Sequence, residues 1–328
     1  MSTIPIMPFG LPIEVAALLN ESAIVSKLDQ LLSTLLCSCR EIGVLLREGE
    51  VSSDKTGTSN VFGDEQLDVD IQTDAILFGS LRVSGLVHVA ASEEKPVEEE
   101  MGGEGFSVAF DPLDGSSIVD ANFAVGTIVG VFPGRGLQGR VGREQVAALF
   151  AQYGPRVTIA LAIAASCTLS GCPLCLELTL RRERWIVSRP EFKISSKAKT
   201  FAPGNLRATS DNERYRMLVT YWIENKYTLR YSGGLVPDIY HILIKGEGVL
   251  ANASSPAAKA KLRLLFEAAP IAFIIECAGG LSCVCSSEAA EPMPPSSLLD
   301  VPISDLDKRV GVCFGSSIEV DRFRAHIF

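Results

Sequence analysis

The stretch Asp111-Pro-Leu-Asp-Gly-Ser-Ser117 follows a short apolar run, Phe106 to Phe110, and indicates the fold more clearly than any other part of the chain. The apolar run predicts a buried strand. Because proline cannot donate a ladder hydrogen bond, Pro112 predicts that this strand ends at the residue before it. The sequence therefore places two carboxylates, three residues apart, at the end of a buried strand.

The second half of the same stretch predicts a turn and the start of a helix. Gly115 permits a tight turn, and the spacing Ser117-x-x-Asp120 resembles a capping box with Asp in the distal position. Carboxylates bind hard cations, and helix N-termini bind phosphate, so this turn would supply both halves of a metal-dependent phosphatase site. An ordinary Asx-type turn before a capped helix is the alternative.

A second pair of carboxylates follows another predicted strand. Ser92-Glu93-Glu94 comes directly after the apolar run from Leu86 to Ala91. In open α/β sheets, ligands bind outside the carboxyl ends of the strands, so these glutamates would face the two aspartates of the first stretch. A solvated acidic loop is the alternative, because Glu98-Glu-Glu100 follows closely.

An amphipathic helix is expected upstream of both strands. Leu67, Ile71, Ala75 and Phe78 form an apolar stripe with the 3.6-residue period of a helix. Asp64, which follows Gly63, is the expected N-cap. Asp70 and Asp74 lie one helical turn apart on the polar face, where they either approach the other carboxylates or face solvent.

A fourth motif, Lys259-Ala-Lys-Leu-Arg-Leu-Leu-Phe-Glu267, also predicts a helix. The i,i+4 spacing of Arg263 and Glu267 suits a simple surface ion pair. In a phosphatase, Lys261 and Arg263 would instead neutralise phosphate, and Glu267 would join the carboxylates that bind the metal.

Together these motifs resemble the fructose-1,6-bisphosphatase superfamily in order and spacing. The resemblance covers residues 25 to 328 and also includes Leu229-Arg-Tyr-Ser-Gly-Gly234. Four segments are similar to a branch of the superfamily that acts on a seven-carbon sugar bisphosphate: Ile118-Val-Asp120, Phe201 to Thr209, Tyr227 to Asp238, and Ser254 to Lys261.

The resemblance implies an α/β fold, a layered αβαβα sandwich with two mixed sheets. It implies an N-terminal metal-binding α/β domain over residues 1–195 and a C-terminal substrate-binding α/β domain over residues 196–328, with the active site between them. The implied reaction is Mg²⁺-dependent hydrolysis of the 1-phosphate of a sugar bisphosphate. Action on the six-carbon substrate, alone or in addition, is the alternative.

Metal and catalytic roles are carried over from the resemblance. One ion would bind to Glu93, Asp111, Asp114 and Glu267, and a second to Glu93, Asp111 and the carbonyl of Leu113. A third, weaker ion would bind to Asp64 and Glu93, so the expected cofactor is two to three Mg²⁺ per subunit, with Mn²⁺ as an alternative. Asp70 and Glu94, with Asp64, would orient and deprotonate the attacking water.

Substrate contacts and assembly are implied in the same way. The scissile phosphate would contact Gly115, Ser116, Ser117, Gly233, Gly234 and Arg263, and the distal phosphate Asn205, Arg230, Tyr231 and Lys261. Arg230 reaches into a neighbouring subunit in such proteins, so we expect a homo-oligomer, most simply a dimer.

Two departures from the fructose-bisphosphatase pattern change these expectations. Where that pattern has two tyrosines near the distal phosphate, this chain has Ala208 and Ala251. Smaller side chains there would leave room for a longer sugar. The loop Asp54 to Asn60 also lacks the cysteine pair that plant enzymes of the seven-carbon branch carry.

Composition excludes several other classes of protein. The 328-residue chain has a net charge of −9, which argues against nucleic acid as a partner. No uninterrupted apolar run reaches the length of a membrane span, and residues 1–17 have no targeting character. We therefore expect a cytoplasmic protein, or a plastid protein if a leader has been removed.

The nine cysteines and three histidines do not have the spacing of a zinc site. Cys172, Cys175, Cys283 and Cys285 are expected to be buried free thiols in a reducing compartment. Cys37 and Cys39 lie two positions apart in a predicted helix, where side chains diverge. We therefore expect activity that is indifferent to thiol reductants.

The remaining pattern predicts alternating helices and strands, which favours α/β layers. Helices are expected over residues 26–47, 211–226 and 236–244, strands near residue 249 and over residues 272–276 and 310–315, and a hairpin over residues 157–187 with its turn near 170–173. A phosphatase of other specificity and a non-catalytic metal-binding scaffold remain alternatives. The complete set of seven acidic residues (Asp64, Asp70, Glu93, Glu94, Asp111, Asp114, Glu267) favours catalysis.

Overall fold

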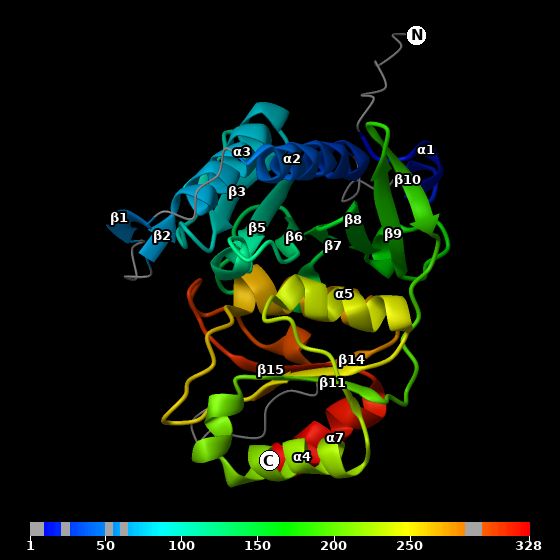
Figure 1. The fold of residues 1–328 in the computed structure, drawn as a ribbon. Coiled ribbons are helices and arrows are strands. Elements are labelled where there is room, and N and C mark those ends of the chain that lie inside the picture. The colour runs from blue at the N-terminus through cyan, green and yellow to red at the C-terminus, as the bar shows by residue number, and fades with distance from the viewer. Residues whose placement is uncertain (1–9, 21–26, 50–54, 60–64, 286–296) are drawn as a thin grey trace, which may run out of the picture.

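The computed structural model describes residues 10–20, 27–49, 55–59, 65–285 and 297–328, and its elements stack in five layers (Figure 1). Two helices cover the outer face of a large sheet, two helices lie between that sheet and a smaller one, and two helices cover the far face of the smaller sheet. The predicted αβαβα arrangement with two mixed sheets is confirmed.

The larger sheet has eight strands in the order β10-β9-β8-β7-β6-β5-β3-β4. All neighbours are antiparallel except β3 and β5. The strands are β3 (Val87–Ser92), β4 (Glu99–Glu100), β5 (Phe106–Asp114), β6 (Val125–Pro133), β7 (Ala147–Tyr153), β8 (Val157–Ile163), β9 (Leu174–Arg181) and β10 (Arg184–Arg189). The first half of the chain is therefore mainly a meander, and the expected alternation of helices with strands through residue 153 is wrong.

The smaller sheet has five strands in the order β12-β11-β13-β15-β14. Its strands β12, β11 and β13 are mutually parallel, so their carboxyl ends lie at one edge, whereas β15 is antiparallel to both of its neighbours. The strands are β11 (Thr200–Gly204), β12 (Thr228–Leu229), β13 (Val249–Asn252), β14 (Leu281–Cys285) and β15 (Gly311–Gly315). Two short strands, β1 (Lys55–Ser59) and β2 (Glu65–Leu67), pair separately.

The helices cover the sheets in pairs (Figure 1). The outer pair on the large sheet is α2 (Leu28–Glu48) and α3 (Asp68–Ser84), the central pair is α5 (Leu235–Lys245) and α6 (Ala269–Cys277), and the pair on the small sheet is α4 (Glu213–Glu224) and α7 (Ser317–Ile327). A four-residue helix, α1 (Ile13–Ala16), lies near the N-terminus. The helices predicted near residues 26–47, 211–226 and 236–244 are confirmed as α2, α4 and α5, and no described helix is long and apolar enough to cross a membrane.

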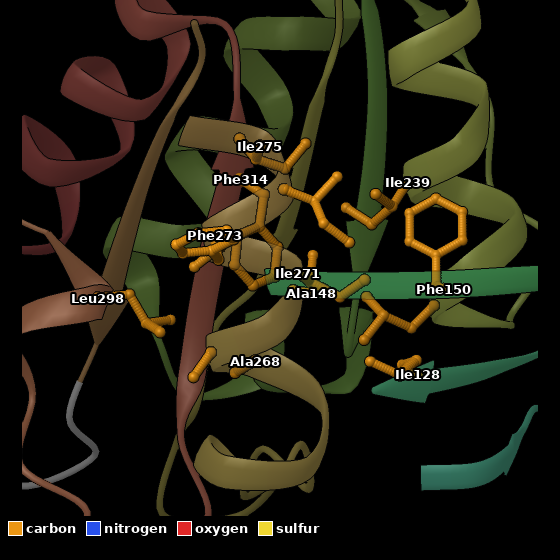
Figure 2. Close-up of a cluster of buried hydrophobic side chains, with 14 of the residues drawn as sticks. Ile128, Ala148, Phe150, Ile239, Ala268, Ile271, Phe273, Ile275, Leu298 and Phe314 are labelled. Carbon is orange, nitrogen blue, oxygen red and sulfur yellow. The ribbon is translucent and has the colours of Figure 1, made fainter. Parts of the chain in front are cut away.

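The segment from residue 259 to 277 differs from its prediction. Residues 272–276 belong to helix α6 and not to a strand, and residues 259–263 are not helical. A π-helical turn, Leu264–Ala268, begins after Arg263 and continues directly into α6. Helix α6 lies between the sheets, and seven of its nine residues are buried, so its apolar residues show no helical period by which it could be distinguished from a strand (Figure 2).

Strand β5 also differs from its prediction, because it continues through Pro112 to Asp114. The register with β6 shifts between Asp111 and Asp114, and the hydroxyl of Thr127 on β6 donates to the carbonyl of Pro112 at 2.8 Å. Pro112 is tolerated because it lies in this irregular part of the ladder. The helix that follows is only a 3₁₀ turn, Ser116–Ile118, with Gly115 as its N-cap, so the predicted capping box at Ser117 is wrong.

Two further predictions concern the start of helix α3 and the burial of the cysteines. Helix α3 begins at Asp68, after strand β2, and the predicted N-cap Asp64 lies outside the described residues. All nine cysteines are free, but Cys172 is exposed in the turn between β8 and β9, whereas Cys175, Cys283 and Cys285 are buried as expected. The turn itself lies where the sequence predicts it.

Gly126 on β6 lies directly against helix α5. A β-carbon at this position would lie 2.5 Å from a methyl of Val236 and 2.6 Å from the carbonyl oxygen of Ala151. We predict that Gly126→Ala lowers the free energy of unfolding by about 1–3 kcal/mol, because the helix must move to relieve the overlap.

Denaturant unfolding of Gly126→Ala beside Gly79→Ala tests this prediction. Gly79 lies on the exposed face of helix α3 with open space around its β-carbon position, so its replacement should raise the free energy of unfolding by about 0.5–1 kcal/mol. An unchanged stability of Gly126→Ala would contradict the tight packing of α5.

Candidate active site

Three carboxylates from three separate elements meet where the large sheet approaches the π-helical turn. Single carboxylate oxygens of Glu93, Asp111 and Glu267 all lie within 4.8 Å of one another. Glu93 follows β3, Asp111 lies in β5, and Glu267 lies in the turn that leads into α6. We call these three residues the carboxylate cluster.

Strand pairing and a backbone turn explain why the cluster forms. Strands β3 and β5 are parallel, and Ser92 pairs with Phe110, so the next residue of each strand lies at the same edge. The amide of Glu93 donates to the carbonyl of Phe110 at 3.0 Å, which fixes Glu93 beside β5. The amide of Arg263 donates to the Glu267 carboxylate at 2.6 Å, which orients that side chain from its own turn.

The cluster is electrostatically unfavourable without a cation. Burial raises the pKa of Asp111 and of Glu267, and the charge of Glu93 raises both further. The guanidinium of Arg263 offsets part of this charge, because it pairs with Glu93 and, at 2.7 Å, with Asp307. Arg263 is buried, so this ion pair is part of the site and not a surface feature.

The donor set of the cluster fits a hard divalent cation. All three groups offer carboxylate oxygens, which Mg²⁺ and Mn²⁺ prefer, and neither sulfur nor imidazole belongs to the cluster. Carboxylates that repel one another in a buried place are those that gain most from a bound cation.

Asp114 has different partners from the three cluster residues. Its carboxylate accepts hydrogen bonds from the amides of Leu235 at 3.2 Å and Val236 at 2.6 Å, at the start of helix α5. Burial raises the pKa of Asp114 to about 7, although these two amides act in the opposite direction. The residue therefore connects β5 to a helix from the other half of the chain.

Besides the cluster and Asp114, the structure describes three more of the residues predicted for metal binding and catalysis. Leu113 is buried, and its amide donates to the Asp111 carboxylate at 3.0 Å. Asp70 is buried on helix α3, and Glu94 is half-buried in the turn after β3. Asp64 lies outside the described residues.

The turn after β5 lies against the start of helix α5. A β-carbon on Gly234 would lie 3.5 Å from the side chain of Ile118, so residues 115–118 and 233–234 are neighbours. The amides of Gly233 and Gly234 already donate to Asp238 and to the hydroxyl of Ser232. Among the described residues, none accepts from the amides of Ser116 or Ser117, so these two amides are available for an anion.

The residues predicted for the distal phosphate lie at the edge where β12, β11 and β13 end. Arg230 and Tyr231 follow β12, Asn205 follows β11, and Lys261 lies in the segment after β13. The side-chain amide of Asn205 donates to the carbonyls of Ala253 and Ala258, both at 2.8 Å. Asn205 therefore joins two of the three strand ends to each other.

Sequence reasoning missed one cation at this edge. Arg207 is exposed on the 3₁₀ turn Leu206–Ser210 and forms no salt bridge with any described residue. Burial and Asp238 raise the pKa of Tyr231, whereas Arg207 lowers it, which indicates that the guanidinium lies near this phenol. The signal in the sequence was an arginine two residues after Asn205.

The expectation that Ala208 and Ala251 leave room for a longer sugar is wrong. Both side chains are fully buried in the core between the small sheet and its outer helices, where Tyr215 packs with them. The hydroxyl of Tyr215 donates to the carbonyl of Gly204 at 2.6 Å. No sugar can enter this packed space, so discrimination between substrates must come from exposed groups.

Comparisons with known proteins agree with this geometry. Residues 14–171 match the model of the fructose-1,6-bisphosphatase N-terminal domain, and residues 194–327 match that of its C-terminal domain. The chain belongs to the fructose-1,6-bisphosphatase family.

The similar proteins include both sedoheptulose-1,7-bisphosphatases and fructose-1,6-bisphosphatases. The chain is 47% identical over 305 residues to a chloroplastic sedoheptulose-1,7-bisphosphatase of Spinacia oleracea, a match that covers 91% of this chain and 74% of the relative. It is 36% identical over 310 residues to a class 1 fructose-1,6-bisphosphatase of Trichlorobacter lovleyi, with 92% and 91% covered.

One solved structure is similar to this chain in three dimensions. A crystal structure from Toxoplasma gondii, of a protein provisionally named a sedoheptulose-1,7 bisphosphatase, is 38% identical to this chain. Its TM-score is 0.81, with 92% of this chain and 94% of that one covered.

The raised pKa values of Asp111, Glu267 and Asp114 predict how stability depends on pH. An unfolded Asp or Glu titrates near pH 4, and the folded pKa of Asp114 is about 7. Stability contributed by the protonated forms is complete below pH 4 and is lost as pH rises through the folded values. We predict that the melting temperature in chelator falls between pH 5 and pH 8.

Thermal unfolding in chelator and in Mg²⁺ checks this prediction. A bound cation favours the ionised carboxylates, so Mg²⁺ should raise the melting temperature more at pH 8 than at pH 5. In Asp111→Asn, the fall in chelator should be shallower. A melting temperature that rises with pH in chelator, in the wild-type chain, would contradict the charge balance described for the cluster.

Proposed function

We propose that this chain hydrolyses the 1-phosphate of sedoheptulose 1,7-bisphosphate to give sedoheptulose 7-phosphate and inorganic phosphate. The observation that carries the proposal is the carboxylate cluster, together with the amides of Ser116 and Ser117, which no described residue accepts from. A separate edge in the other half of the chain carries cations that form no salt bridge with a described residue. One end of a bisphosphate would be cleaved at the cluster while the other end is held at the edge.

The metal requirement follows from the cluster. We propose that Glu93, Asp111 and Glu267 bind Mg²⁺ or Mn²⁺, with Asp114, the Leu113 carbonyl and Asp64 completing sites for two to three ions. The ions would polarise the phosphoryl oxygens and stabilise the leaving alkoxide. Each oxygen of Asp114 accepts one amide hydrogen bond from helix α5 and keeps a lone pair that a cation could use.

The protein groups position the reactants. The amides and hydroxyls of Ser116 and Ser117, after the tight turn at Gly115, would donate to the scissile phosphate. Asp70, on helix α3, and Glu94, in the turn after β3, would accept the proton of the attacking water. Phosphoryl transfer needs little covalent chemistry from the protein, so orientation and charge suffice.

The distal phosphate would lie at the edge formed by Arg207, Tyr231 and Lys261 of one subunit, with Arg230 supplied by the other subunit. None of these three cations forms a salt bridge with a described residue, in a chain whose net charge is −9. Asn205 would support this edge through its two hydrogen bonds and would not have to contact phosphate.

The relatives favour the seven-carbon substrate, since the sequence identity to the spinach sedoheptulose-1,7-bisphosphatase exceeds that to the bacterial fructose-1,6-bisphosphatase. Fructose 1,6-bisphosphate is the second candidate.

Further proposals concern organisation and compartment. We propose a metal-binding half over residues 1–195 and a substrate-binding half over residues 196–328. We also propose a homodimer in which Arg230 contacts the distal phosphate bound to the neighbouring subunit. The exposure of Arg230 and Tyr231 supports such an assembly. Nine free cysteines favour a reducing compartment, either the cytoplasm or a plastid.

We predict that Asp111→Asn abolishes phosphatase activity while the fold survives. The change removes one charge from the cluster and one oxygen ligand, but it keeps the shape of the side chain. Phosphate release in Mg²⁺ and circular dichroism of the same samples measure the two effects. An active Asp111→Asn enzyme, or wild-type activity that persists in excess chelator, would refute the metal mechanism.

We predict a higher kcat/KM for sedoheptulose 1,7-bisphosphate than for fructose 1,6-bisphosphate, by roughly 1–3 kcal/mol in transition-state binding. Arg207→Met should raise KM for the seven-carbon substrate roughly tenfold with kcat retained, because a charge-assisted contact to the distal phosphate is lost.

Steady-state kinetics on both substrates tests these values, with Arg216→Met as the matched control. Arg216 lies on helix α4, and among the described residues its ion-pair partner is Glu213, at the surface. An equal or higher kcat/KM for the six-carbon substrate would reverse the choice of substrate. An unchanged KM in Arg207→Met would remove Arg207 from the distal site.

A further inference from the structure

The turn that presents Glu93 and Glu94 is held by contacts outside the carboxylate cluster. The amide of Ser92 donates to the carbonyl of Lys95 at 3.1 Å, and the amide of Lys95 donates to the hydroxyl of Ser92 at 3.0 Å. These bonds close the turn on itself. The bond from the Glu93 amide to the carbonyl of Phe110 joins the turn to β5, but none of these three bonds joins it to helix α3.

The side chain of Lys95 adds a contact between the turn and helix α3. Its ammonium lies 3.1 Å from an oxygen of Asp74 and 4.8 Å from the centre of the Phe78 ring. Phe78 in turn packs edge-on against Phe110 of β5, with ring centroids 5.1 Å apart. The turn, the helix and the strand that carries Asp111 are thus joined through one lysine.

Asp74, the ion-pair partner of Lys95, is buried, unlike the carboxylate of a surface ion pair. The side chain of Asp74 is only 3% exposed, whereas that of Lys95 is 51% exposed. Burial raises the pKa of Asp74, and the Ser92 hydroxyl and Lys95 lower it. A buried carboxylate without a cation is costly, so the fold strongly favours conformations in which Lys95 stays at this position.

Helix α3 also carries Asp70, one turn before Asp74. The same helix therefore carries Asp70, which is proposed to activate the water, and Asp74, which binds Lys95 of the metal-binding turn. Mutual repulsion among the acidic groups would push Glu93 and Glu94 away from Asp111 and Glu267. The link between Lys95 and Asp74 opposes that displacement from the side away from the cluster.

We propose that Lys95 and Asp74 are positioning residues that hold the turn of Glu93 and Glu94 in its metal-binding geometry. They touch neither substrate nor metal and act through the two glutamates. The proposal rests on the proposed function only in assigning the cluster to a divalent cation.

Mn²⁺ titration, followed by electron paramagnetic resonance of the free ion, tests the proposal without reference to turnover. Lys95→Met keeps the length and apolar stem of the side chain over Phe78 but removes the charge. Outer residues that orient metal ligands typically change affinity tenfold or more, so we expect Mn²⁺ to bind roughly tenfold more weakly. Lys95→Arg should restore most of the affinity.

Arg82→Met is the matched control. Arg82 lies on the same helix and pairs with Glu99 on β4, a few residues after the turn. Its loss should leave Mn²⁺ affinity unchanged. The double variant Asp74→Asn/Lys95→Met should bind Mn²⁺ no more weakly than the weaker of its two single variants, because both changes break the same link.

Three results would overturn the proposal: unchanged Mn²⁺ affinity in Lys95→Met, an equal loss in Arg82→Met, or additive losses in the double variant. The half-saturating Mg²⁺ concentration for activity should rise with the Mn²⁺ dissociation constant. A wild-type chain that binds Mn²⁺ but cleaves no sugar bisphosphate would refute the proposed function alone. Normal turnover together with normal Mn²⁺ binding in Lys95→Met would refute the positioning role alone.

Discussion

Repulsion among buried carboxylates is the constraint around which the site is built. Glu93, Asp111 and Glu267 come from three elements, and each is held by backbone contacts that do not depend on the others. A single guanidinium, that of Arg263, partly balances them. The protein thus holds like charges together before any cation arrives, which is the form of preorganisation that metal-assisted phosphoryl transfer requires.

Much of this site can be read from the sequence because the informative residues are local. The strand before Asp111 and the strand before Glu93 are both apolar runs, and their ends are marked by acidic residues. Glu267 was different, because its motif was predicted as a helix whose ion pair lay on one face. The structure places Arg263 in extended conformation and Glu267 in a π-helical turn, and only the resemblance to a family gave Glu267 its role.

What the sequence could not predict depends on contacts between distant segments. Helix α6 was mistaken for a strand, since a helix buried on all sides carries no polar face. The role of Ala208 and Ala251 was misjudged because the side chain that packs with them, Tyr215, is not marked by any local pattern. The bonds from Asp114 to helix α5 span more than a hundred residues and have no sequence signature.

The central helical layer has a consequence for how the chain acquires its structure. One apolar core contains residues of the large sheet such as Ile128 and Phe150, residues of α6 such as Ile271, and residues of the small sheet such as Phe314 (Figure 2). Each half of the polypeptide contributes one side of this core, so either half alone would expose a broad apolar surface to water. A chain cut before α6 would leave the inner face of the large sheet uncovered, and we expect such a fragment to aggregate although the core on its outer face is complete.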